Sequence, residues 1–144
     1  MKFSNGCWLQ KEHVACFSPA QVYHAEMDDK RVRLLCPTAR IEGRGDTLGG
    51  VNLTVEITAP MDGVLRVRTT HHAGIMPKGP SFELALPEGR PLDAEETAEK
   101  IIVRSGSLCV EIDRASAALS FFRGGERLTR SERNDLAYVK TGWS

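Results

Sequence analysis

Two stretches of this chain alternate strictly between apolar and polar residues, and a period of two is the pattern of a strand with one buried face. In the first stretch, residues 51–58, the apolar positions are Val51, Leu53, Val55 and Ile57. Residues 59–63 then contain Pro60 and Gly63, which are typical turn residues. Leu65 and Val67 resume the alternation within residues 64–72. We therefore predict an antiparallel hairpin of residues 51–58 and 64–72.

The second alternating stretch predicts another hairpin and a third strand behind it. In residues 108–113 one face carries Leu108, Val110 and Ile112, and the other carries Cys109, Glu111 and Asp113. After a turn, Leu119 and Phe121 continue the apolar face, so this set is expected in the core. Gly124 and Gly125 indicate a tight turn before residues 126–128.

The rest of the chain also favours strands over helices. Residues 20–27 and 30–36, joined by Asp28 and Asp29, form a third and weaker hairpin pattern. Glycines and prolines interrupt residues 73–92, which predicts a surface excursion or short edge strands. Residues 93–98 have helical propensity but precede a β-branched run, so their state stays open, with a strand beginning near Glu99. The expected fold is all-β, a sandwich of antiparallel strands forming one domain over residues 1–144.

Charge and composition exclude several function classes. The chain has 19 basic and 19 acidic residues and only 6% aromatic residues, which argues against nucleic acid as a partner. Residues 1–7 lack the apolar core of a signal peptide, and no apolar run is long enough to span a membrane. A cytoplasmic protein is expected. The spacing of the cysteines does not fit a metal site, so we predict reduced thiols at Cys7, Cys16, Cys36 and Cys109. Neither a metal nor a cofactor is expected.

Similar β-sandwiches form aldose mutarotases, and that resemblance would imply opening of a sugar ring by a glutamate base and histidine acids. His71 and His72 are the pair that this chemistry would need. Neighbours on a strand point to opposite faces, so a structural role is the preferred interpretation for both. His13 and His24 are isolated in the sequence, and the same interpretation applies to them.

The acidic pairs and one glycine-containing loop are interpreted as structural. Asp28 and Asp29 fit a turn, and Glu95 and Glu96 fit a solvated surface rather than a catalytic dyad. Residues 40–46 contain Arg-Gly-Asp but lack the context of a phosphate loop, so a flexible connection is expected.

Aromatic rings could form a sugar-binding platform, because flat rings stack on the C–H faces of pyranoses. The available rings are dispersed along the chain: Trp8, Tyr23, Phe82, Tyr138 and Trp143. Phe121 and Phe122 are adjacent, so at least one of them is expected in the core. Trp143 is the ring expected to be exposed. Two interpretations therefore stay open for a chain that acts on its own: a free-standing carbohydrate-binding module and a small mutarotase.

The order and spacing of these hairpins resemble the N-terminal β-sandwich of glycoside hydrolase family 31, the α-glucosidases and α-xylosidases. Residues 105–113, 119–122 and 125–128 carry the resemblance, together with the earlier hairpin around residues 59–68. Residues 1–9 and 19–23 are more particularly similar to bacterial α-xylosidases. The resemblance covers almost the whole chain.

The resemblance implies a non-catalytic domain of the galactose-mutarotase-like type. Retaining members of the family hold their catalytic aspartates on a (β/α)₈ barrel, which follows this domain. The chain ends at Ser144 before any barrel, so no catalytic residue can be carried over and the substrate-binding residues are unknown. The implied role is to support and frame the barrel of the same polypeptide, whose substrate is a carbohydrate. An incomplete sandwich would leave free strand edges, for which self-association is expected.

Overall fold

The computed structural model describes residues 14–71 and 89–142, which form eleven strands and two short 3₁₀ turns. The elements are β1 Val14–Phe17, β2 His24–Met27, β3 Arg31–Pro37, η1 Arg44–Thr47, β4 Asn52–Thr58, β5 Arg66–Thr70, β6 Asp93–Glu96, β7 Lys100–Ser105, β8 Leu108–Asp113, β9 Leu119–Arg123, β10 Glu126–Ser131, η2 Arg133–Leu136 and β11 Tyr138–Thr141.

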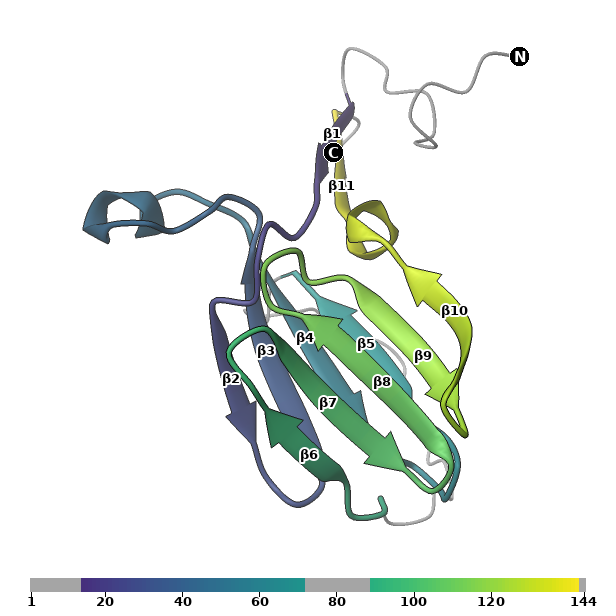
Figure 1. Ribbon diagram of the computed structural model, residues 1–144. Helices are drawn as coiled ribbons and strands as arrows, with labels where there is room; N and C mark the ends of the chain where they lie inside the picture. The colour runs from purple at the N-terminus through teal and green to yellow at the C-terminus, as the bar shows by residue number, and fades with distance from the viewer. Residues whose placement is uncertain (1–13, 72–88, 143–144) are drawn as a thin grey trace.

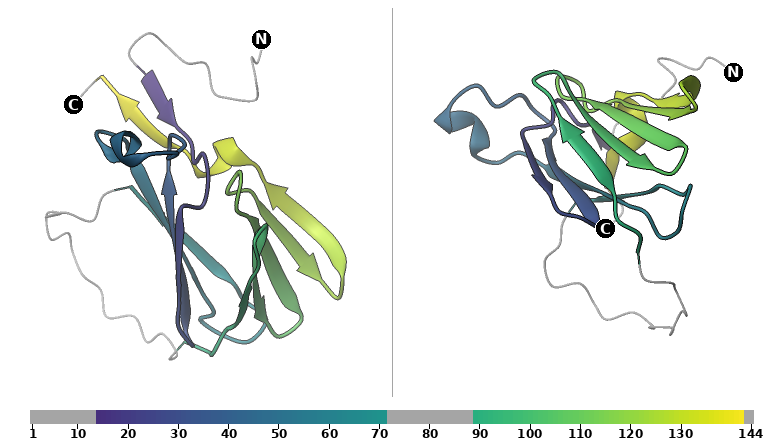
Figure 2. Two further views of the ribbon diagram at one scale, coloured as in Figure 1. Left: turned by 60° about the vertical axis from the view of Figure 1, so that its left-hand side comes forward. Right: turned by 60° about the horizontal axis from the view of Figure 1, so that its bottom comes forward.

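Two antiparallel sheets lie face to face and form the body of the molecule (Figure 1). One sheet has the order β2-β3-β4-β5, and the other has the order β10-β9-β8-β7-β6. A separate ribbon of β1 and β11 stands at one end (Figure 1). Figure 2 shows the two sheets edge-on as distinct layers. The prediction of an all-β sandwich of antiparallel strands is confirmed.

The core lies between the two sheets and is built from alternate residues of the central strands. The four-stranded sheet contributes Val32, Leu34, Cys36, Leu53, Val55 and Ile57, each at most 1% exposed. The five-stranded sheet contributes Ile101, Val103, Val110, Ile112 and Leu119, each at most 2% exposed. Burying an aliphatic side chain of this size stabilises a fold by about 1.5–3 kcal/mol, so this double layer is the main source of stability.

The first predicted hairpin is confirmed as β4 and β5, with Ile57 paired to Val67. The second strand is shorter than predicted, because β5 covers Arg66–Thr70 rather than residues 64–72. Leu65 and Val67 are partly buried against the core, as the alternation predicts.

The second predicted hairpin is confirmed as β8 and β9, with Ile112 opposite Leu119 and Val110 opposite Phe121. The prediction that Leu108 lies in the core is wrong. Leu108 is half-buried, because it lies at the end of the hairpin opposite Arg123. Gly124 and Gly125 have φ values of +57° and +88° and form the turn into β10, which suits a tight hairpin turn.

The third predicted hairpin is also confirmed, as β2 and β3. The prediction of a strand over residues 20–27 was too long, because β2 begins at His24. Upstream of β2, Val22 is 5% exposed and its N–H donates to the Arg114 carbonyl at 2.8 Å. This backbone bond ties the segment to the opposite sheet, while the N–H groups of Ala20 and Tyr23 still donate to the Pro37 and Leu35 carbonyls of β3 at 2.8 and 2.9 Å.

Residues 93–96 form strand β6 in spite of their helical propensity. Ala94 lies opposite Val103 and packs against the core, which a helix at this position would not allow. Pairing with β7 therefore overrides local propensity. β7 itself begins at Lys100, one residue after the predicted position. Thr97 closes the connection, since its hydroxyl accepts the Lys100 N–H at 3.1 Å.

The outer strands of both sheets bear charged residues or irregular backbone. In β10 the register with β9 shifts between Arg127 and Thr129, which leaves Leu128 unpaired and 52% exposed. Bulges and charges on edge strands discourage pairing between molecules. Segment 73–92, predicted to be an excursion, lies mostly outside the described residues. No helix in the described ranges has the length and apolar character needed to cross a membrane.

The opposite faces of β8 yield a first test of the register. Ile112→Ala should lower the free energy of unfolding by about 2–5 kcal/mol, because it opens a cavity in the core. Its neighbour Glu111 faces solvent, and Glu111→Ala should cost no more than about 1 kcal/mol. Urea unfolding of both variants measures the difference. Equal losses would contradict the assigned faces.

A second test concerns the turn between β9 and β10. A Cβ added at Gly125 would meet no atom within 4 Å, so only its φ of +88° opposes a side chain. Gly125→Ala should therefore cost about 1–2 kcal/mol in thermal or urea unfolding. Gly45 is equally open but has no positive φ, so Gly45→Ala is the matched control and should be close to neutral. A neutral Gly125→Ala would show that the turn adopts another conformation.

Candidate functional site

A groove of about 390 Å³ lies where β5 ends and η2 leads into β11. It brings together two residues that the sequence suggested separately, His71 as a candidate acid and Tyr138 as a candidate platform ring. The groove is lined by Leu53, Thr69, Thr70, His71, Asp135, Leu136, Ala137 and Tyr138. Leu136 and Tyr138 also pack against the core, so η2 and the start of β11 help to cover it at this end of the sandwich.

The rings of this groove stack on one another. The His71 ring lies parallel to the Tyr138 ring, with 3.8 Å between centroids and 2° between planes. Phe17, which lies opposite Tyr138 in the ribbon, stacks on it with centroids 6.0 Å apart. These contacts use the faces of Tyr138 for packing within the protein, which favours a structural role over a sugar platform. Phe17 was missed by the sequence analysis, because nothing local signals its pairing with β11.

The other candidate rings do not gather at this groove. Tyr23 is 52% exposed just before β2. Phe121 is partly buried and packs against the core, whereas Phe122, its neighbour, lies on the outward side of β9 opposite Cys109. The expectation that one of the two belongs to the core is confirmed. Trp8, Phe82 and Trp143 lie outside the described residues.

Among the described residues, the groove does not assemble the groups that a mutarotase needs. His71 is exposed at the end of β5, and the described residues that line the groove include no glutamate. The groove is also lined by the carboxylate of Asp135, which accepts the backbone N–H of Glu132 at 2.8 Å and so closes the η2 turn. His24 is exposed on β2 with Nε2 3.9 Å from Glu26. His13 and His72 lie outside the described residues.

Asp28 and Asp46 are engaged in local turn chemistry. Asp28 accepts the N–H of Lys30 at 2.9 Å, and this bond is the main reason that its pKa is lowered, with the Arg31 guanidinium contributing. Asp46 accepts the N–H groups of Glu42 and Gly43 at 2.9 and 2.8 Å, which lowers its pKa too. The loop of residues 40–46, expected to be a flexible connection, thus contains the hydrogen-bonded 3₁₀ turn η1.

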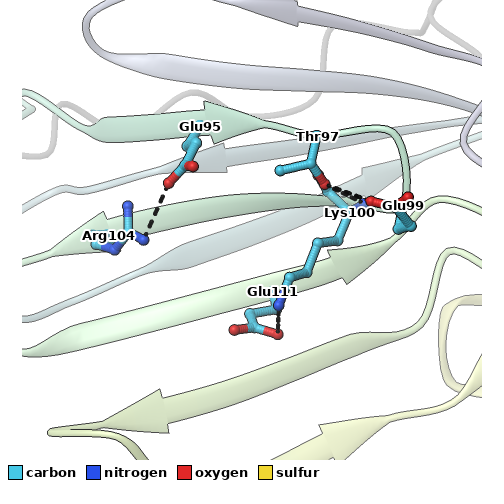
Figure 3. Close-up of polar contacts among 6 residues, drawn as sticks. All are labelled: Glu95, Thr97, Glu99, Lys100, Arg104 and Glu111. Atoms are coloured by element: carbon cyan, nitrogen blue, oxygen red, sulfur yellow. Dashed lines mark hydrogen bonds and ion pairs between the residues drawn. The ribbon is translucent and has the colours of Figure 1, made fainter.

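The adjacent acids Glu95 and Glu96 pair with different arginines. Glu95 lies 3.4 Å from Arg104 across β6 and β7, as Figure 3 shows. Glu96 pairs with Arg114, which follows β8. Each carboxylate is therefore drawn to its own cation, and the two do not form a shared site.

The outward face of the five-stranded sheet carries a polar network that the sequence analysis did not predict. Lys100 on β7 reaches Glu111 on β8 at 2.9 Å (Figure 3). Arg104 also pairs with Asp93 at 3.3 Å. The signal for this network is the polar half of each alternating strand. Only the register, however, sets Asp93 opposite Arg104 and Glu111 diagonally across from Lys100.

The described cysteines are all free thiols. Cys36 is fully buried in the core, and burial raises its pKa to about 12. Cys16 and Cys109 are half-buried, and burial also raises the pKa of Cys109. Cys7 lies outside the described residues. Within residues 14–71 and 89–142, no three His, Cys, Asp or Glu side chains gather as a metal site would require.

The Cys36 thiol predicts a pH dependence of stability. Its pKa in the folded chain, about 12, lies above the ordinary value of 9.0, so folding favours the protonated thiol. That contribution is complete below pH 9 and is lost as pH rises toward 12. The loss approaches about 1.4 kcal/mol per pH unit in this window.

Urea unfolding at pH 8, 9 and 10 measures this loss. Cys36→Ala is the control, because groups that titrate in both proteins cancel in the comparison. The variant should lose less stability than the natural chain between pH 9 and 10. Parallel pH profiles would contradict the burial of the thiol.

The fold places the chain in the class of antiparallel β-sandwich proteins. Its buried polar residues, among those described, are Ser18 and Ser105. No known family profile matches the chain. It is similar to the α-xylosidase XylQ of Lactiplantibacillus pentosus, with 31% identity over an alignment 144 residues long, which covers 96% of this chain. It is also similar to an α-xylosidase of Emericella nidulans, with 31% identity over 121 residues and 84% coverage. The chain spans only 18% and 15% of these two proteins.

Proposed function

We propose that this chain is the N-terminal sandwich of an α-xylosidase, a part that supports and frames the active site without supplying its catalytic groups. The similarity to two α-xylosidases carries the proposal, because it runs along almost the whole chain yet covers less than a fifth of either relative. Most of each relative therefore lies elsewhere, with room for a catalytic (β/α)₈ barrel. The sandwich would be of the galactose-mutarotase-like type.

The carboxylates of the described residues support a non-catalytic role. Retaining glycosidases need two carboxyl groups about 5–5.5 Å apart, and the general acid among them needs a raised pKa. Asp28 and Asp46 each have a lowered pKa, because backbone N–H groups donate to their carboxylates. A lowered pKa keeps the group ionised at neutral pH, which is unsuited to donating a proton.

The rigidity of the sandwich suits a framing role. The two sheets bury a continuous core, and Val67 of β5, Leu136 of η2 and Tyr138, the first residue of β11, pack against it. Residues held in this way can position a neighbouring domain. We place the contact with the barrel of the same polypeptide at this end, around the groove of His71 and Tyr138.

The proposal is tested with a chimera. Replacing the matching segment of the L. pentosus α-xylosidase by this chain should preserve release of nitrophenol from 4-nitrophenyl α-xyloside, whereas deleting the segment should abolish it. The isolated 144-residue chain should release none, because the proposal places the catalytic carboxyl pair on the barrel.

Two results would contradict the proposal. Hydrolysis by the isolated chain would make it an enzyme in its own right. An inactive chimera that is folded and soluble, judged by circular dichroism, would remove the framing role and favour a free-standing carbohydrate-binding module.

A further inference from the structure

A small polar hollow of about 210 Å³ lies on the outward face of the five-stranded sheet, and its lining shares no residue with the groove described above. It is lined by Glu99, Lys100, Glu111, Asp113, Ala118, Ser120 and Arg130. Ser120 stands between Glu111 on β8 and Arg130 on β10 in the strand register. The short side chain of Ser120 beside two long ones leaves the space open, and the sheet beneath makes the floor rigid.

The hollow presents hydrogen-bond donors and acceptors together. Lys100 and Glu111 pair at 2.9 Å, yet an ammonium has three N–H donors and a carboxylate two oxygens, so both keep capacity for a ligand. Arg130 uses its Nε for Glu132 at 2.9 Å, which leaves its terminal amino groups. The Ser120 hydroxyl has no hydrogen-bond partner within the described part of the chain.

The charge of the lining favours a neutral ligand. Three carboxylates face two cations in the hollow, so neither an anion nor a cation is strongly attracted. A hydroxyl group both donates and accepts, and several adjacent hydroxyls would satisfy the mixed lining.

We propose that this hollow binds a single neutral sugar ring, with the hydroxyls held by Lys100, Glu111, Ser120 and Arg130. Its volume lies below the range of about 300–1,000 Å³ for sites of drug-sized molecules, which fits one ring rather than an oligosaccharide. The choice of xylose as the probe rests on the proposed function. The hollow is a second, non-catalytic sugar site, distinct from the groove at the end of β5.

The experiment is an NMR titration of the ¹⁵N-labelled 144-residue chain with D-xylose. Saturable shifts are expected in the amides around residues 99–100, 111–113, 118–120 and 130. Ser120→Leu fills the hollow and should weaken binding at least tenfold. Thr54→Leu, on the outward face of the other sheet, is the matched control and should bind as the natural chain does.

Several outcomes would overturn this site. They are the absence of saturable shifts, shifts confined to the groove of His71 and Tyr138, or unchanged binding by Ser120→Leu. Shifts at the hollow with inorganic phosphate but not with xylose would also reject a neutral sugar as its ligand. An active chimera whose sandwich binds no xylose would refute the site and leave the proposed function standing. Xylose binding at the hollow with an inactive chimera would support the site and refute the proposed function.

Discussion

The mutual burial of two apolar sheet faces is the interaction on which the rest of this structure depends. Neither sheet could leave Leu34 and Ile57, or Ile101 and Ile112, in water, and the two layers cover one another almost completely. Because the side-chain period of a strand is two, this burial also decides which residues face outward. The polar network around Lys100 and Glu111 is therefore a consequence of the burial of the opposite face.

The same period explains what the sequence could predict. Alternation assigned Val110 and Ile112 to the core and Glu111 to solvent, and a one-residue error in register would have reversed every assignment. Turn residues such as Gly124 and Gly125 placed the hairpin ends, since the positive φ of both positions suits glycine. The three hairpins are local in sequence, and each was found.

What the sequence could not predict depends on pairing that no local pattern signals, some of it between distant segments. Strands β1 and β11 join residues near the two ends of the chain, and a four-residue segment such as Val14–Phe17 has no period long enough to recognise. Residues 93–96 read locally as helical, and only the pairing of Ala94 with Val103 makes them a strand. The stack of His71 on Tyr138 arises in the same way, from two residues that no spacing rule relates.

The position of the polar groups also bears on the division of labour that we propose for this sandwich and a catalytic barrel. Acid catalysis needs a carboxyl group held in an apolar pocket, but the core between these sheets is filled with aliphatic side chains. Introducing a buried carboxylate would cost part of the burial that joins the sheets. The outward faces, by contrast, hold ionised groups in mixed pairs on a rigid floor, which suits weak recognition of hydroxyls. Under the proposed function, such a sandwich orients a neighbouring domain, and bond cleavage belongs to the barrel.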